Sequence, residues 1–111
     1  MQTDKEMLEI AEKYLIRMTD DDDIEAVILD IEKKEYGNIY FFNNKKYIET
    51  GEFRYAIGNN APFLVEKEKR RVVQFGTSGK LELQIEAYEN GTFTGALNTY
   101  WYPDEDRFSY K

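Results

Sequence analysis

The sequence predicts an α+β fold, in which an N-terminal helix packs on a mainly antiparallel sheet with the strand order of a meander. An apolar stripe at helical spacing occurs near the N-terminus, and β-branched and aromatic runs separated by turn segments follow it. The chain has 111 residues, enough for one domain with a modest core and too few for two. We therefore expect residues 1–111 to form a single domain.

The first helix is expected to begin at Thr3. Thr3 and Glu6 have the spacing of a capping box, in which each side chain accepts a bond from the other residue's backbone N–H. The apolar stripe that follows consists of Met7, Leu8, Ala11, Tyr14, Leu15 and Met18. This stripe predicts packing against a core. Four aspartates at 20–23 oppose the negative C-terminal pole of a helix, so they predict an exposed loop.

Four strands are expected after this loop. The predicted segments are 26–31, 39–42, 63–65 and 71–75, with a turn at 36–38 between the first two. Gly58, Asn59, Asn60 and Pro62 are predicted to form a structural turn before the third strand. Glycine fits such a turn, the asparagines can bond its backbone, and Pro62 sets the entry of the chain into the sheet.

Residues 80–89 carry two conflicting patterns. Apolar and polar residues alternate, and Asn90-Gly91 follows, which favours a strand and a hairpin. Leu, Glu, Gln and Ala are good helix formers, and Leu81, Ile85 and Tyr88 share one helical face, which favours a helix capped by Gly91. The residues alone leave both interpretations open.

The last twenty residues are expected to add a C-terminal strand or tail. Residues 92–103 are rich in strand formers, whereas the acidic residues 104–111 are expected to be loosely held. Three adjacent aromatics cannot all point to one side of an extended chain. Trp101 is interpreted as a core residue, with a partner-binding hot spot as the alternative.

Composition excludes several kinds of chemistry. The chain has no cysteine and no histidine, so it offers no disulfide, no thiolate and neither the commonest general base nor the commonest transition-metal ligand. Its first residues lack the apolar core of a signal peptide, and no stretch approaches membrane-spanning length. We expect a cytoplasmic protein without cofactors.

Charge is distributed unevenly. Residues 1–35 have a net charge of −7, residues 36–80 of +4 and residues 81–111 of −4, for a total of −7. Nucleic acids and anionic membranes repel an acidic protein, whereas basic partners attract it. We therefore expect no nucleic-acid or membrane partner, although ordinary solubilising surface also accounts for the acids.

No segment supports an enzyme. The aspartate run lacks the spacing of a calcium loop, and Gly58 with its two asparagines lacks the spaced glycines, lysine and Ser/Thr of a phosphate loop. A carboxylate pair such as Glu49 and Glu52 is expected by chance among 22 acids. The basic strip formed by Lys67, Lys69, Arg70 and Arg71 is interpreted as a solvated hairpin turn.

A family resemblance adds to this reading. Its pieces are, in order, Tyr36-Gly37, Glu49-Thr50-Gly51-Glu52, Gly58-Asn59, Ala61-Pro62-Phe63-Leu64-Val65, Lys67 and Gly76-Thr77. In this order and spacing the chain resembles the immunity protein 35 family, also called YrhB-like domains. The resemblance extends more weakly to the N-terminal helix and to residues 81–89, for which it implies a helix. Residues 92–111 extend beyond the family core.

The resemblance implies a function without catalysis. Such proteins bind and neutralise a cognate toxin of a bacterial polymorphic toxin system in the cytoplasm; a chaperone-like or general protein-interaction domain is the alternative. We expect a monomer or weak homodimer. The predicted partner interface combines exposed acids and spare aromatics, namely Asp21, Asp22, Asp23, Tyr100, Trp101, Tyr102, Asp104, Glu105 and Asp106.

Overall fold

The residues that the structure describes form a six-stranded antiparallel sheet. The computed structural model describes residues 2–19, 24–57, 60–77, 79–95 and 98–110. The strands are β1 (Ala26–Lys34), β2 (Gly37–Asn44), β3 (Phe63–Glu66), β4 (Val72–Gln74), β5 (Tyr100–Tyr102) and β6 (Arg107–Ser109). They lie in chain order, and each pairs antiparallel with the next. The predicted α+β meander is confirmed.

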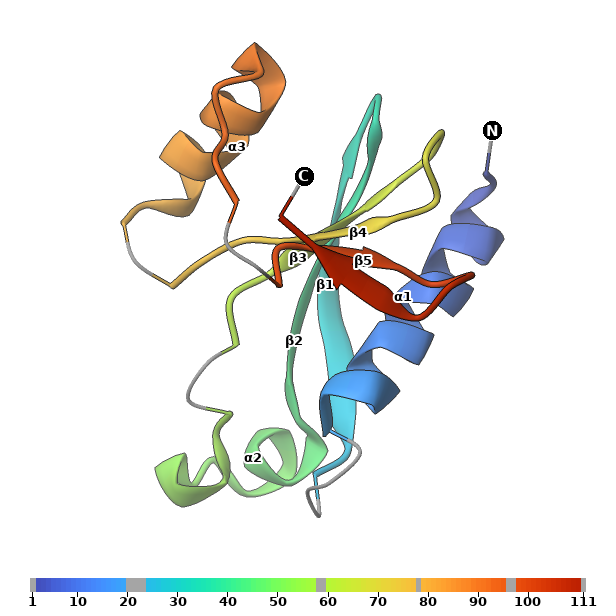
Figure 1. Cartoon of the computed structure of the whole chain (residues 1–111). Coiled ribbons are helices and arrows are strands. Elements are labelled where there is room, and N and C mark those ends of the chain that lie inside the picture. The colour runs from blue at the N-terminus through green and yellow to red at the C-terminus, as the bar shows by residue number, and fades with distance from the viewer. Residues whose placement is uncertain (1, 20–23, 58–59, 78, 96–97, 111) are drawn as a thin grey trace.

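Helix α1 (Asp4–Thr19) covers one face of this sheet (Figure 1). The capping box is present, because the Glu6 backbone N–H donates to Thr3 Oγ1 at 3.2 Å and the Thr3 N–H donates to Glu6 Oε1 at 3.1 Å. The buried stripe differs from the predicted one at three positions. Ile10 joins it, Leu8 is only half-buried, and Met18, in the last turn, is 36% exposed and borders a surface groove.

Helix α3 (Leu81–Asn90) lies on the opposite face (Figure 1). Alternate strand residues point to opposite sides of a sheet, so Tyr40, Phe63 and Val65 pack with α1. Ile39, Leu64, Val73 and Phe75 pack on the side of Leu81, Ile85 and Tyr88. The segment with two conflicting patterns is therefore a helix. Gly91 ends it with a φ of 75° and donates its N–H to the Ala87 and Tyr88 carbonyls.

Two short helical elements were not expected. Helix α2 (Lys45–Thr50) begins where the sequence indicated only the end of a strand, and the 3-10 turn η1 (Phe53–Tyr55) follows. Asn44 caps α2, with its side-chain oxygen accepting from the Lys46 N–H at 3.2 Å. Gly51 ends α2 with a φ of 71°. Asn44 and the lysines that follow it therefore start a helix.

The expected C-terminal strand is present as β5, but the expectation that residues 104–111 are loosely held is wrong, because Arg107–Ser109 form β6. Strands β5 and β6 form a hairpin in which Trp101 lies opposite Phe108. Trp101 is 1% exposed, which confirms its interpretation as a core residue. Its indole Nε1 donates to Asp106 Oδ1 at 2.9 Å, and Arg17 of α1 donates to the same oxygen at 2.5 Å. These contacts fix the hairpin beside α1 (Figure 1). Among the described residues, no helix has the length and apolar character to span a membrane.

Candidate functional site

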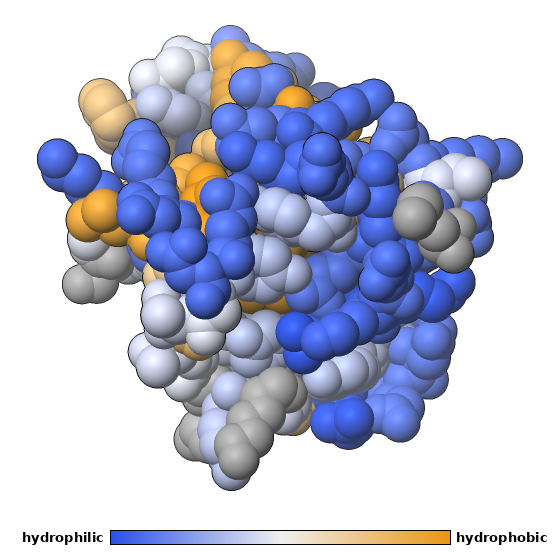
Figure 2. All heavy atoms as spheres, turned by 90° about the horizontal axis from the view of Figure 1, so that it is seen from above, coloured by the Kyte–Doolittle hydropathy of each residue, from blue (hydrophilic) through white to orange (hydrophobic). Residues whose placement is uncertain are grey.

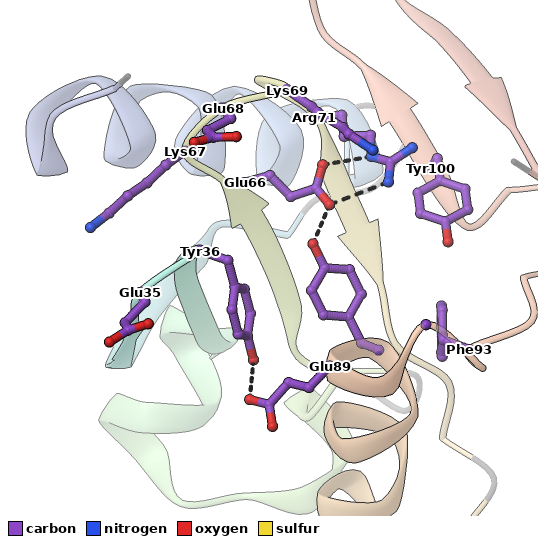
Figure 3. A pocket seen from close by; sticks show the side chains of 12 residues that line it. Glu35, Tyr36, Glu66, Lys67, Glu68, Lys69, Arg71, Glu89, Phe93 and Tyr100 are labelled. Atoms are coloured by element: carbon purple, nitrogen blue, oxygen red, sulfur yellow. Dashed lines mark hydrogen bonds and ion pairs between the residues drawn. The ribbon is translucent and has the colours of Figure 1, made fainter.

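A cleft of about 610 Å³ lies at the end of the sheet where the β1–β2 and β3–β4 turns meet the C-terminal end of α3. The two turns are joined by a hydrogen bond from the Lys67 N–H to the Tyr36 carbonyl at 2.9 Å. Aromatic and charged side chains line the cleft, including Tyr36, Tyr88, Phe93, Tyr100, Glu66, Arg71 and Glu89 (Figure 3). These elements are far apart in the sequence, so the site exists only in the folded chain.

A buried ion pair forms the floor of the cleft. Arg71 Nε and Nη2 donate to the two carboxylate oxygens of Glu66 at 2.6 and 3.3 Å. Only 12% of the Arg71 side chain and 6% of the Glu66 side chain are exposed. Arg71 also donates to the Tyr102 hydroxyl at 3.1 Å, and its guanidinium lies 4.2 Å from the centre of the Tyr100 ring. The planar guanidinium is thus held in a single orientation.

Arg71 keeps its charge because of these bonds. Burial disfavours the charged guanidinium, but hydrogen bonds to Glu66 and Tyr102 outweigh this and hold the pKa of Arg71 above its ordinary value. The Tyr88 hydroxyl donates to Glu66 Oε2. Burial, and then this hydrogen bond, raise the pKa of Tyr88. Tyr88 therefore stays a neutral donor at physiological pH.

A second tyrosine and glutamate pair lies on the other side of the Tyr88 ring. Tyr36 Oη donates to Glu89 Oε2 at 2.7 Å, and the rings of Tyr36 and Tyr88 are 5.1 Å apart. Burial and the bond to Glu89 raise the pKa of Tyr36. In Figure 3, Tyr36 and Glu89 point toward one another, whereas Lys67 extends away from both. The two pairs tie α3 to β3 and to the β1–β2 turn.

The cleft presents fixed charges and neutral hydroxyl donors. Tyr36 and Tyr88 hold their protons, and Glu66 accepts three hydrogen bonds. Within the described part of the chain, no group of three or more Asp or Glu side chains is placed to hold a metal ion. Viewed from the end of the sheet in Figure 2, the surface is mostly hydrophilic, with small hydrophobic patches between. This arrangement favours recognition of a polar partner.

The structure divides the predicted partner interface. Asp21, Asp22 and Asp23 lie outside the described residues. Tyr100 and Trp101 are buried, which leaves Tyr102 half-buried and the acids of the β5–β6 turn exposed. Whether a partner contacts this turn stays a prediction.

The three exposed acids of the β5–β6 turn already have partners in the chain. Asp104 lies 3.5 Å from Arg70, Glu105 pairs with Arg107, and Asp106 accepts from Arg17 and Trp101. The two hydrogen bonds hold the pKa of Asp106 below its ordinary range. The negative charge of these three acids is therefore partly neutralised within the molecule.

The predicted structural turn is described only in part. Gly58 and Asn59 lie outside the described residues. Asn60 Nδ2 donates to the Phe42 carbonyl of β2 at 3.4 Å, so its bond reaches across to a strand. The Pro62 carbonyl accepts from the Phe75 N–H at 3.3 Å, immediately before β3. Both residues hold the entry to the sheet in place.

Sequence reasoning missed the centre of the cleft. The interpretation of the basic strip as a solvated turn is wrong for Arg71, because Arg71 is packed against Tyr100 and paired with Glu66. A signal was present, since opposite charges flank the β3–β4 hairpin directly outside its apolar residues. Tyr36 and Tyr88, by contrast, gave no sign of meeting, because they are far apart in the chain.

A second groove, of about 570 Å³, separates α1 from β1. Leu8, Leu15, Ile16 and Ile28 line it, together with Glu12 and Glu25. Thr19 and Ile24, the residues that flank the aspartate run, lie at its edge.

Comparison with known proteins identifies the family. No family model and no solved structure matches the chain. The uncharacterized protein YrhB of Escherichia coli strain K12 is 30% identical to it over 70 residues, which cover 63% of this chain and 74% of YrhB. Because the match spans most of YrhB at this identity, the chain belongs to the YrhB family.

Proposed function

We propose that this protein binds a cognate bacterial protein toxin and neutralises it by covering its functional surface, without catalysis of its own. The cleft beside α3 is the observation that carries the proposal. It combines tyrosines and a rigidly held arginine with charges at its rim, and these residue types dominate the energetics of protein interfaces. The resemblance to immunity proteins supplies the kind of partner.

The charge of the protein suits such a task. A net charge of −7 speeds encounter with a basic surface, and many toxins that act on nucleic acid would present one. Exposed ion pairs contribute little affinity, so the tight part of the complex depends on packing in the cleft.

Co-expression with the toxin encoded beside this gene tests the proposal. We expect restored growth of the toxin-expressing cells and a one-to-one complex in size-exclusion chromatography with light scattering. Hydrogen exchange of the complex should slow at the two turns and at the end of α3. A toxin of unrelated sequence serves as the control.

Absence of both rescue and complex would remove the toxin assignment. If the protein instead suppressed aggregation of unrelated clients without a stoichiometric partner, a chaperone-like domain would replace it. Such clients would use the exposed apolar side chains of the surface, among them Phe53 and Ile16.

A further inference from the structure

The two tyrosine and glutamate pairs of the cleft differ in one respect. Glu66, which accepts from Tyr88, also holds the Arg71 guanidinium, which lies over the Tyr100 ring. Glu89, which accepts from Tyr36, forms no ion pair with any described residue. On one side of Tyr88, a carboxylate, an aromatic ring and a guanidinium are all present, in Glu66, Tyr100 and Arg71. On the other side, the described residues supply only the carboxylate of Glu89 and the ring of Tyr36.

A second observation also indicates that a positive charge would be favoured beside Glu89. Glu89 lies in the last turn of α3, where the helix dipole presents its negative pole to the cleft. That turn contains no basic residue, although a cation there is favoured. The carboxylate of Glu89 and the helix pole therefore act in the same direction on a positive group placed beside Tyr36.

Carboxylates outnumber cations in the cleft by only one, because Glu35, Glu66, Glu68 and Glu89 line it together with Lys67, Lys69 and Arg71. Glu35 and Glu68 also line the cleft, and neither forms an ion pair with a described residue. Lys67 lines the cleft too, but its ammonium extends away from Tyr36 and Glu89 (Figure 3). A cleft of about 610 Å³ has room for a long side chain to enter.

We propose that the position beside Tyr36 and Glu89 is a binding site for a cationic side chain of the partner, an arginine in the first instance. The guanidinium stacks on the Tyr36 ring and donates to Glu89, as Arg71 does with Tyr100 and Glu66. Only the identity of the partner, a protein toxin, rests on the proposed function. The site itself is formed by residues of this chain.

Titration of the full chain with Nα-acetyl-arginine amide, followed by backbone amide chemical shifts, tests the site. We expect saturable shifts at Tyr36, Tyr88 and Glu89, and much weaker ones with the uncharged isostere Nα-acetyl-citrulline amide. Inorganic phosphate is the third probe. Shifts at these residues with phosphate, or equal shifts with arginine and citrulline, would overturn the proposal.

Variants test whether the carboxylate of Glu89 binds the guanidinium. Glu89→Gln should weaken arginine amide binding about threefold to tenfold. Glu82→Gln, an exposed carboxylate in the first turn of the same helix, should leave it unchanged. Tyr36→Phe keeps the ring and releases Glu89, so binding should persist. Amide spectra of each variant check the fold, and equal affinity of Glu89→Gln and the wild-type chain would contradict the inference.

The site and the toxin assignment can fail separately. A chain that binds arginine amide through Glu89 but rescues no cells keeps the site and loses the assignment. A Glu89→Gln chain that rescues cells as well as the wild type keeps the assignment, and the toxin then does not use this site.

Discussion

Glu66 and Arg71 form an ion pair whose contribution depends on both partners. Arg71→Met leaves a buried carboxylate without its cation, and we expect a loss of about 3–5 kcal/mol in the free energy of unfolding. The double variant Glu66→Leu with Arg71→Met removes both charges and should recover most of that loss. Urea denaturation measures both. Equal destabilisation of the single and double variants would show that packing, not charge, matters at this position.

The buried tyrosines predict weakening at alkaline pH. Burial raises the pKa of Tyr14, Tyr36 and Tyr88 above the ordinary value of 10.0. Above that pH the unfolded chain loses phenolic protons that the folded chain keeps, so the free energy of unfolding falls as pH rises. Urea midpoints at pH values on either side of 10 measure this.

Tyr88→Phe serves as the control for the alkaline effect. It removes one of the three groups, so the fall in stability with pH should become shallower, although the variant starts from a lower stability at neutral pH. An unchanged slope would mean that Tyr88 titrates normally in the folded chain.

At the scale of elements, strands β2 and β3 approach closely at Gly37. A Cβ at this position would lie 2.1 Å from the Val65 carbonyl oxygen, which is backbone and cannot move aside. Gly37→Ala should therefore cost about 1–3 kcal/mol or more, measured by urea denaturation. Gly51→Ala is the matched control, because it meets no atom within 4 Å and bears only the strain of its φ of 71°. A smaller loss at Gly37 than at Gly51 would refute the steric account.

Helix α3 is less deeply buried than α1, so we expect it to open more readily. Its described residues include none that is buried, whereas α1 buries five. Native-state hydrogen exchange should therefore show faster exchange in α3 than in the centre of α1. Tyr88→Phe, which loses the bond to Glu66, should speed exchange in α3 and leave α1 unchanged. Equal protection of the two helices would contradict this.

The sequence was informative wherever neighbouring residues decide the structure. The Thr3 and Glu6 capping box and the β-branched runs predicted α1 and the first strands. Helix α2 was missed although Asn44 and Gly51 are its caps, because the preceding strand pattern dominated the interpretation. At residues 80–89 alternation and helix propensity balanced, and only the family resemblance favoured the helix that forms.

The cleft was beyond this kind of reasoning. Arg71 was recognisable as basic, but its bonds to Glu66, Tyr102 and the Tyr100 ring depend on how the β3–β4 hairpin, β5 and α3 meet. The bond from Tyr36 to Glu89 likewise joins the β1–β2 turn to helix α3, which local patterns cannot bring together. A C-terminal strand was expected, but its pairing with β6 was missed for the same reason, since Asp106 contacts Arg17 only in the folded chain.

For the whole molecule, long-range electrostatics predicts how fast a basic partner binds. Reversing Asp21 to Asp23 to lysine should slow association with the toxin about tenfold at low salt and reduce its salt dependence. Stopped-flow fluorescence measures the rate. An equal charge change at the exposed residues Glu9, Glu49 and Glu86 is the control. If both triple variants slow association equally, net charge alone matters, and the aspartate run is not part of the interface.

Strands β4 and β5 are neighbours in the sheet, yet residues 75–99 separate them in the chain. A short turn would join them without any change of strand order. The stretch that contains α3 is therefore an insertion in an otherwise continuous meander. This insertion supplies four of the twelve residues that line the cleft, and the sheet with its turns supplies the other eight. Substitutions and length changes in this insertion can therefore change which partners the cleft binds, while the order and pairing of the strands stay the same. Recognition can then evolve separately from the fold.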